Sequence, residues 1–153
     1  MSNSSVIDQS RSGWDGYESL DTRFTNRLDY SSHDDITIEI FLSGSSSIPI
    51  AVTAKVDTGS KFCIFQPRYA VVLGFDLKTG FRESIRTAAG SFIAYGHEIT
   101  LTVGDMEWNA VVYFAEPGNF PVNVVGRVGF LDHLQVGLID YEQLLYLSPF
   151  GVT

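Results

Sequence analysis

The sequence predicts an all-β protein: a single domain built as a closed β-barrel or sandwich, with one or two short helices. Apolar and polar residues alternate along many short segments, which is the pattern of half-buried strands. Turn-forming residues separate these segments about every 8–12 residues, and helical periodicity is rare. A chain of 153 residues that is 44% hydrophobic has enough apolar surface for one core.

The first two strands are predicted to form a hairpin. Over residues 36–42 every even position is isoleucine or leucine, so these side chains share one face of a strand. Residues 44–47, a glycine and three serines, have the composition of a turn. In the second strand, residues 48–56, the even positions are again apolar, and Asp57 therefore leaves the strand on the opposite face.

The rest of the domain follows the same pattern. Further strands are predicted at residues 62–65, 81–88, 92–103, 106–115, 122–125, 134–141 and 144–147. The segment 88–91 is a hairpin tip between two of them. A short helix is predicted over residues 67–73, because proline suits its first turn and Gly74 suits the position beyond its end. A second short helix is predicted at residues 130–133.

The first 33 residues differ from the rest. They are rich in serine, aspartate, asparagine and arginine, and they show neither helical nor strand periodicity. We therefore expect residues 1–33 to be a flexible or loosely docked extension, and residues 34–150 to form the domain. The aromatic residues of the extension leave open that part of it packs on the domain or on a partner.

Composition excludes several classes of function. A formal net charge of −8 with ten basic residues argues against nucleic-acid binding, which relies on clustered lysine and arginine. The N-terminus lacks the pattern of a signal peptide, and no window is long and apolar enough for a membrane helix, so we expect a soluble cytoplasmic protein. The one cysteine, Cys63, lies in an apolar strand and is expected to be buried and inert.

The sequence Asp57-Thr58-Gly59 interrupts the apolar pattern at the end of a strand. Glycine allows a tight turn there, and threonine can hydrogen-bond to the backbone, so the carboxylate of Asp57 would be held in a fixed direction. Asp57 is therefore a candidate general acid or base. The structural alternative is an Asx-turn that simply ends the strand.

The order of four segments resembles that of the retropepsin-like aspartic proteases, the single-domain dimeric relatives of pepsin. These segments are Val56–Ser60 after a strand, the apolar strand 62–65, the glycine-tipped hairpin 87–90, and Val124–Arg127 before a short helix. The resemblance covers about residues 36–148. It implies a retropepsin-like fold and the activity of an aspartic endopeptidase.

The resemblance also implies a role for each residue of the Asp57 loop. Asp57 would be the catalytic carboxylate, and Ser60 would hydrogen-bond to it. Thr58 would bond to the loop of a second copy, and Gly59 would line the floor beneath the substrate backbone. Because this chemistry needs two carboxylates that share a proton and the chain has one such loop, the implied enzyme is a homodimer that acts on a peptide or protein.

Two further segments receive roles from the resemblance. A flap over the substrate would be formed by Ala88, Ala89 and Gly90. The residues packed under the Asp57 loop would be Val124, Val125 and Gly126.

Two positions depart from the family's pattern. Lys61 stands where an aspartate often pairs with the arginine of the Gly-Arg segment, and Val128 stands where aspartate is common. Arg127 must then find another partner, for which Asp132, Asp140 or a carboxylate of the second copy are candidates.

Other chemistries are less well supported. His33, His97 and His133 are isolated and pair with no cysteine motif, so no metal or other cofactor is expected. Ser60 and Ser91 lack the surroundings of a serine nucleophile. Two alternatives to the protease remain: a catalytically inactive binding or assembly module with the same fold, and an unrelated β-barrel ligand carrier.

Overall fold

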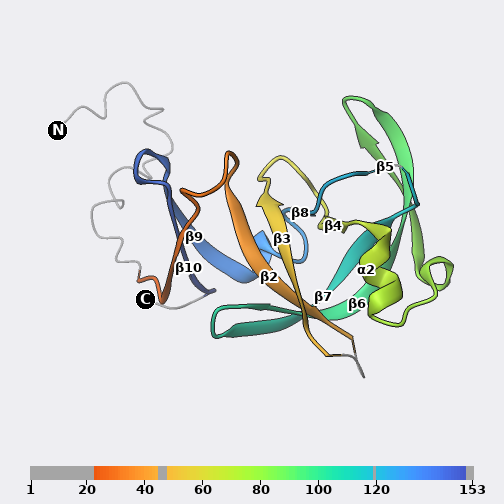
Figure 1. The fold of residues 1–153 in the computed structure, drawn as a ribbon, viewed down its shortest axis with the longest axis horizontal. Helices are drawn as coiled ribbons and strands as arrows, with labels where there is room; N and C mark the ends of the chain where they lie inside the picture. Colours follow the sequence, from red (N-terminus) through yellow and green to blue (C-terminus); the bar gives the residue numbers. More distant parts are fainter. Residues whose placement is uncertain (1–22, 45–47, 119, 151–153) are drawn as a thin grey trace, which may run out of the picture.

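The computed structural model describes residues 23–44, 48–118 and 120–150. Its main feature is a seven-stranded sheet, shown in Figure 1. The strands follow one another across the sheet in the order β2 (Thr37–Ser43), β3 (Ile50–Val56), β8 (Val124–Val125), β4 (Ile64–Phe65), β7 (Met106–Ala115), β6 (Gly90–Val103) and β5 (Phe81–Thr87). Because β2 also pairs with β6, the strands from β2 to β6 close into a barrel. The prediction of a closed all-β domain is confirmed.

The predicted hairpin of β2 and β3 is present, with Ile40 opposite Val52. The isoleucines and leucine of β2 that were placed on one face are buried from Ile38 to Leu42, and Val52 and Ala54 are buried in β3. The alternation in the sequence therefore identified the core face of both strands. Most of the predicted turn, residues 45–47, lies outside the described residues.

The long strand β6 belongs both to a hairpin with β5 and to the barrel, where it pairs with β2. Its first part pairs with β5, from Gly90 opposite Thr87 to Gly96 opposite Phe81, and this hairpin projects away from the barrel in Figure 1. At the tip, the hydroxyl of Thr87 donates to the carbonyl of Gly90 at 2.9 Å, and Gly90 has a φ of 130°, a value that favours glycine. The hairpin predicted from residues 88–91 is thus confirmed.

A second, three-stranded sheet lies beside the barrel and has the order β1 (Asn26–Asp29), β10 (Leu144–Pro149), β9 (Leu134–Ile139). Strand β1 lies within residues 1–33, the segment that shows no strand periodicity and for which packing on the domain was left open. This strand is four residues long, alternates only between half-buried and exposed positions, and pairs with a strand more than a hundred positions away, so it has no local signal. Residues 1–22 of the expected extension lie outside the described residues.

The helices are short. The predicted helix 67–73 is α2 (Pro67–Val72), and Gly74 follows it with a φ of 85°. The predicted helix at 130–133 is the 3₁₀ turn η4 (Leu131–His133). Two other 3₁₀ turns, η3 (Leu77–Thr79) and η5 (Asp140–Glu142), were not predicted, and η5 replaces the end of the strand expected at 134–141. The strand expected at 122–125 is reduced to Val124 and Val125.

The core fills the barrel and the space between the two sheets. Its largest fully buried side chains are Phe65, Phe114, Phe130, Ile40, Leu42, Leu101, Leu145 and Leu147. These residues come from both sheets, so the three-stranded sheet shares one core with the barrel. In the part of the chain that the structure describes, no helix has the length and apolar character needed to cross a membrane.

Candidate active site

The Asp57 loop is held at the end of β3 by β8. The two strands run parallel, with Val56 beside Val125, and the N–H of Asp57 donates to the carbonyl oxygen of Val125 at 3.0 Å. The N–H of Ser60 then donates to the carbonyl of Asp57 at 3.1 Å. The loop is therefore a tight turn whose start is fixed by a buried strand.

The carboxylate of Asp57 is oriented by its own loop. Its Oδ1 accepts a hydrogen bond from the N–H of Gly59 at 2.9 Å. A Cβ atom at Gly59 would lie 3.3 Å from the same oxygen, which is a tight contact, so glycine suits this position. The bond from Gly59 has the form of an Asx-turn, and within the described residues the other carboxylate oxygen has no hydrogen bond. Thr58 is exposed.

Ser60 does not make the bond that was expected of it. Its hydroxyl donates to the carbonyl oxygen of Phe62 at 2.7 Å, not to the carboxylate of Asp57. A serine hydroxyl commonly bonds to a backbone group close by in the chain, and here the carbonyl lies two residues further on. Ser60 thus shapes the exit of the loop.

The segment that follows β8 lies directly against the Asp57 loop. The N–H of Arg127 donates to the carbonyl of Ser60 at 2.9 Å, and the N–H of Val128 donates to the carbonyl of Lys61 at 2.8 Å. Before them, Val124 and Val125 are buried. These backbone bonds join the Asp57 loop to the segment after β8, and the resemblance to the retropepsin-like proteases implies packing of these two segments.

Gly126 has no room for a side chain. A Cβ atom there would lie 2.4 Å from the carbonyl oxygen of Ser60 and 2.5 Å from that of Phe62, both well inside van der Waals contact. The close approach of two backbones at this point requires glycine. Gly126 therefore fixes the distance between the Asp57 loop and the segment beneath it.

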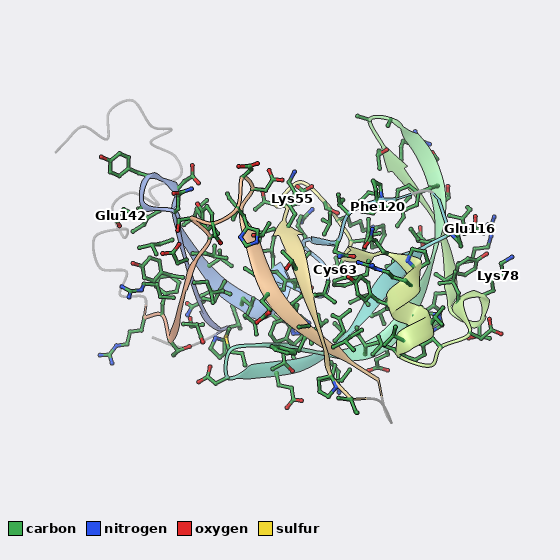
Figure 2. The ribbon with its side chains drawn as sticks, viewed as in Figure 1. Lys55, Cys63, Lys78, Glu116, Phe120 and Glu142 are labelled. Atoms are coloured by element: carbon green, nitrogen blue, oxygen red, sulfur yellow. The ribbon has the colours of Figure 1, made fainter. Side chains whose placement is uncertain are left out.

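Cys63 connects the same segments from inside the barrel (Figure 2). Its Sγ accepts from the N–H of Gly126 at 3.4 Å and donates to the carbonyl of Val128 at 3.4 Å. The side chain is buried, and burial raises the pKa of the thiol to about 12. The thiol is therefore buried and protonated, as expected, but its support of the loop was not predicted, because no local pattern indicates it.

Neither intramolecular partner expected for Arg127 is used. Asp132 accepts the N–H of Gly129 at 3.0 Å, and Asp140 accepts the hydroxyl of Tyr30. Across residues 23–44, 48–118 and 120–150, Arg127 forms no ion pair. The proposal of a carboxylate from a second copy stays open.

A cleft of about 550 Å³ lies between the Asp57 loop and the projecting hairpin. It is lined by Asp57, Gly59, Ser60, Lys61, Phe62, Ile64, Ser84, Ile85, Arg86, Thr87, Phe120 and Val124. The hairpin contributes residues 84–87 of β5, whereas Ala88, Ala89 and Gly90 at its tip are exposed and do not line the cleft. The cleft is mostly apolar, with one acidic group at its floor.

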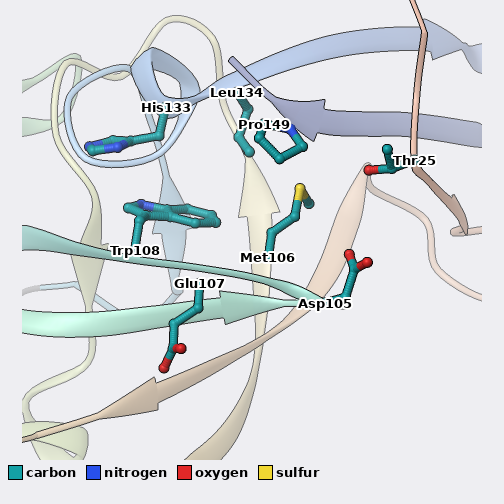
Figure 3. Close-up of a pocket in the computed structure, with 8 residues that line it drawn as sticks. All are labelled: Thr25, Asp105, Met106, Glu107, Trp108, His133, Leu134 and Pro149. Carbon is teal, nitrogen blue, oxygen red and sulfur yellow. The ribbon is translucent and has the colours of Figure 1, made fainter. Parts of the chain in front are cut away.

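A second pocket, of about 390 Å³, shares no lining residue with the Asp57 cleft. Figure 3 shows the ring of His133 stacked on that of Trp108, with ring centres 5.7 Å apart. The indole N–H of Trp108 donates to the carbonyl of Gly129 at 2.8 Å. Trp108 thereby ties β7 to the turn that follows Gly126, so this pocket borders the support of the site and not the site itself.

The described residues contain no group of three or more histidine, cysteine, aspartate or glutamate side chains that could hold a metal ion. The polar chemistry available in the Asp57 cleft is therefore that of one carboxylate, three hydroxyls and two cations. A carboxylate beside an apolar cleft can accept or deliver a proton.

Known structures resemble this chain, although no family model and no curated protein matches its sequence. A retropepsin-like aspartic protease from Rickettsia conorii is 19% identical, with a TM-score of 0.59 over 80% of this chain and 98% of that one. EIAV protease, solved in complex with the inhibitor HBY-793, is 14% identical, with a TM-score of 0.50 over 65% of this chain and 88% of that one. The fold of this chain is that of the retropepsin-like aspartic proteases.

Proposed function

We propose that this protein is an aspartic endopeptidase that works as a homodimer. The observation that carries the proposal is the position of Asp57, which lines one cleft together with residues 84–87 of the projecting hairpin. The fold of the chain, shared with the Rickettsia protease, supports the same conclusion.

The chemistry requires a second copy of the chain. Two carboxylates a few ångströms apart share one proton, because both cannot ionise at such a distance. The ionised Asp57 takes a proton from water as the water oxygen attacks the peptide carbonyl carbon. The protonated Asp57 of the other copy gives its proton to the carbonyl oxygen. The tetrahedral intermediate then breaks at the C–N bond: the first Asp57 gives its new proton to the leaving nitrogen, and the second takes a proton from a hydroxyl of the intermediate, so that the pair again holds one proton.

Two features of the cleft support binding of a peptide for this reaction. The main chain of β5 forms one side of the cleft, and an extended substrate can add to such an edge by backbone hydrogen bonds. The apolar side chains of the cleft would exclude water from the scissile bond. In a twofold dimer each copy would provide one carboxylate, one floor and one hairpin.

The test is peptide hydrolysis by wild-type protein and by Asp57→Asn, measured from about pH 4 to 7, the range in which a shared proton can persist. We expect Asp57→Asn to lose cleavage completely while it keeps its fold and its mass in solution. Asp105→Asn serves as the matched control. Asp105 lies in the turn between β6 and β7, accepts a hydrogen bond from the side chain of Asn26 and does not line the cleft, so this variant should cleave normally.

A second measurement tests the dimer. Two copies joined by a linker, with Asp57→Asn in one copy alone, should be inactive, because the remaining carboxylate has no partner with which to share a proton. Activity per chain of the unlinked protein should also fall on dilution. Cleavage by Asp57→Asn, or full activity of the single-carboxylate dimer, excludes this mechanism. A folded dimer that cleaves no peptide would instead favour the binding or assembly module.

A further inference from the structure

The cleft beside Asp57 carries a charge pattern unlike that of the whole chain. The chain has 18 acidic and 10 basic residues, yet the cleft is lined by two basic residues, Lys61 and Arg86, and by no acidic residue except Asp57. Lys61 belongs to the floor loop, whereas Arg86 belongs to β5 in the hairpin. The two cations therefore reach the cleft from different elements.

Neither cation is neutralised by the chain itself. Among the described residues, Lys61 and Arg86 take part in no ion pair. The ammonium of Lys61 lies 5.2 Å from the centre of the Phe62 ring, a contact that holds the side chain over a cleft residue and leaves its charge uncompensated. A carboxylate that enters the cleft would thus meet two available cations.

Besides the charged groups and three hydroxyl side chains, the cleft is lined mainly by apolar side chains. Ile64, Ile85 and Val124 are buried and contribute aliphatic surface. Phe120 stacks on Phe92 with ring centres 5.0 Å apart, so its ring is fixed where it meets the cleft. Such a surface favours a bulky apolar side chain of a bound peptide over a small or charged one.

The chain limits how far Lys61 lies from the reacting group. Lys61 stands four positions after Asp57, so their Cα atoms are at most about 14 Å apart. An extended peptide advances about 3.3 Å per residue. A side chain that pairs with Lys61 must therefore lie within about four positions of the peptide bond above Asp57.

We propose that the cleft selects peptides with a bulky apolar residue at the scissile bond and a glutamate or aspartate within about four positions of it. This inference rests on the proposed function and names its substrate class. In a twofold dimer the second copy presents the same cations on the far side of the scissile bond. The preferred substrate then has acidic residues on both sides.

The test compares two peptides that share an apolar residue pair at the scissile bond. One carries glutamate three positions away on each side, and the other carries glutamine there. At pH 6 the glutamates are ionised, and we expect kcat/KM for the acidic peptide to be about three- to tenfold higher at low salt. The ratio should shrink as salt is added, because the pairs lie near solvent. Lys61→Gln and Arg86→Gln should each lower the ratio of kcat/KM for the acidic peptide to kcat/KM for the glutamine peptide.

Two matched variants control for net charge. Lys78→Gln changes a lysine on η3 that does not line the cleft, and Arg82→Gln changes an arginine on the same strand as Arg86 that does not line it either. Both should keep the preference for the acidic peptide. An equal loss in these controls would mean that overall charge, and not the cleft, attracts the peptide, and the inference would fall.

A binding measurement separates this inference from the proposed function. Fluorescence anisotropy with labelled peptides and Asp57→Asn protein should show tighter binding of the acidic peptide, with no need for hydrolysis. If wild-type protein cleaves both peptides equally, the substrate class is wrong and the protease stands. If the acidic peptide is preferred in binding but never cleaved, the selectivity stands and the protease falls. If neither peptide binds nor is cleaved, both fall.

Discussion

The backbone N–H of Gly126 donates a hydrogen bond to the sulfur of Cys63 at 3.4 Å, which connects the segment beneath the Asp57 loop to the strand that follows the loop. The same sulfur donates to the carbonyl of Val128. Cys63 thus satisfies two backbone groups on both sides of Arg127. The site is held from below by a side chain that takes no part in the chemistry.

Cys63→Ala should therefore weaken the support of the site. The buried N–H of Gly126 would lose its partner, and the space of the sulfur would be left empty, so the free energy of unfolding should fall by about 1–3 kcal/mol. Urea denaturation followed by circular dichroism measures this value. Cys63→Ser keeps a donor and an acceptor and should lose less. Equal stability of the alanine variant and the wild type would show that the sulfur bonds contribute nothing.

The strands near the site could be predicted from the sequence because they alternate strictly. In β2 and β3 a single face is buried, and a shift of one residue would expose every apolar side chain of that face. The hairpin tip was equally readable, since Gly90 has a φ that favours glycine. Local signals of this kind do not depend on the rest of the fold.

The parts that could not be predicted depend on contacts between distant segments. Strand β1 has one apolar residue, Leu28, and forms only because β10 offers it an edge. The hydroxyl of Ser60 donates to the carbonyl of Phe62 because of the geometry of the turn. That geometry could not be predicted from the local sequence. The cations of the cleft illustrate the same limit: Lys61 and Arg86 are 25 positions apart in the sequence, and only the fold brings them to one surface.

Gly126→Ala adds only one methyl group, but it should disrupt the site strongly. The added Cβ would lie 2.4 Å from the carbonyl oxygen of Ser60, so the two backbones must separate and the hydrogen bond from Arg127 to Ser60 must lengthen. We expect a loss of stability of more than about 2 kcal/mol and a loss of peptide cleavage. Urea denaturation and a cleavage assay measure the two effects.

Gly74→Ala is the matched control for this glycine. Gly74 follows α2 with a φ of 85° and has no atom within 4 Å of an added Cβ, so the change costs only backbone strain of roughly 1–2 kcal/mol. Its cleavage activity should remain normal. The interpretation of Gly126 as a spacer fails if both alanine variants lose the same stability and keep the same activity.

Trp108→Phe tests the bond that ties β7 to the turn after Gly126. Phenylalanine keeps an aromatic ring beside His133 but cannot donate to the carbonyl of Gly129. The free energy of unfolding should fall by about 0.5–1.5 kcal/mol, measured by urea denaturation. Asn109→Ala, at the residue next to Trp108 in β7, removes an exposed side-chain hydrogen bond from Thr100 of β6 and should cost less. A larger loss for Asn109→Ala would contradict this order.

Tyr30→Phe should change how stability depends on alkaline pH. Burial, with the neighbouring Asp140, raises the pKa of Tyr30 to about 12 from its ordinary value of 10.0. The folded chain therefore holds this proton more tightly than the unfolded chain, and the stabilising contribution is complete below about pH 10 and lost as the pH rises towards 12. Between these values wild-type stability should fall more steeply than that of Tyr30→Phe, as urea denaturation at fixed pH steps would measure. Tyr141→Phe is the control, because Tyr141 is 98% exposed, and its free energy of unfolding should fall with pH as steeply as that of the wild type. If the free energies of wild type and Tyr30→Phe fall in parallel, Tyr30 titrates like an unfolded tyrosine.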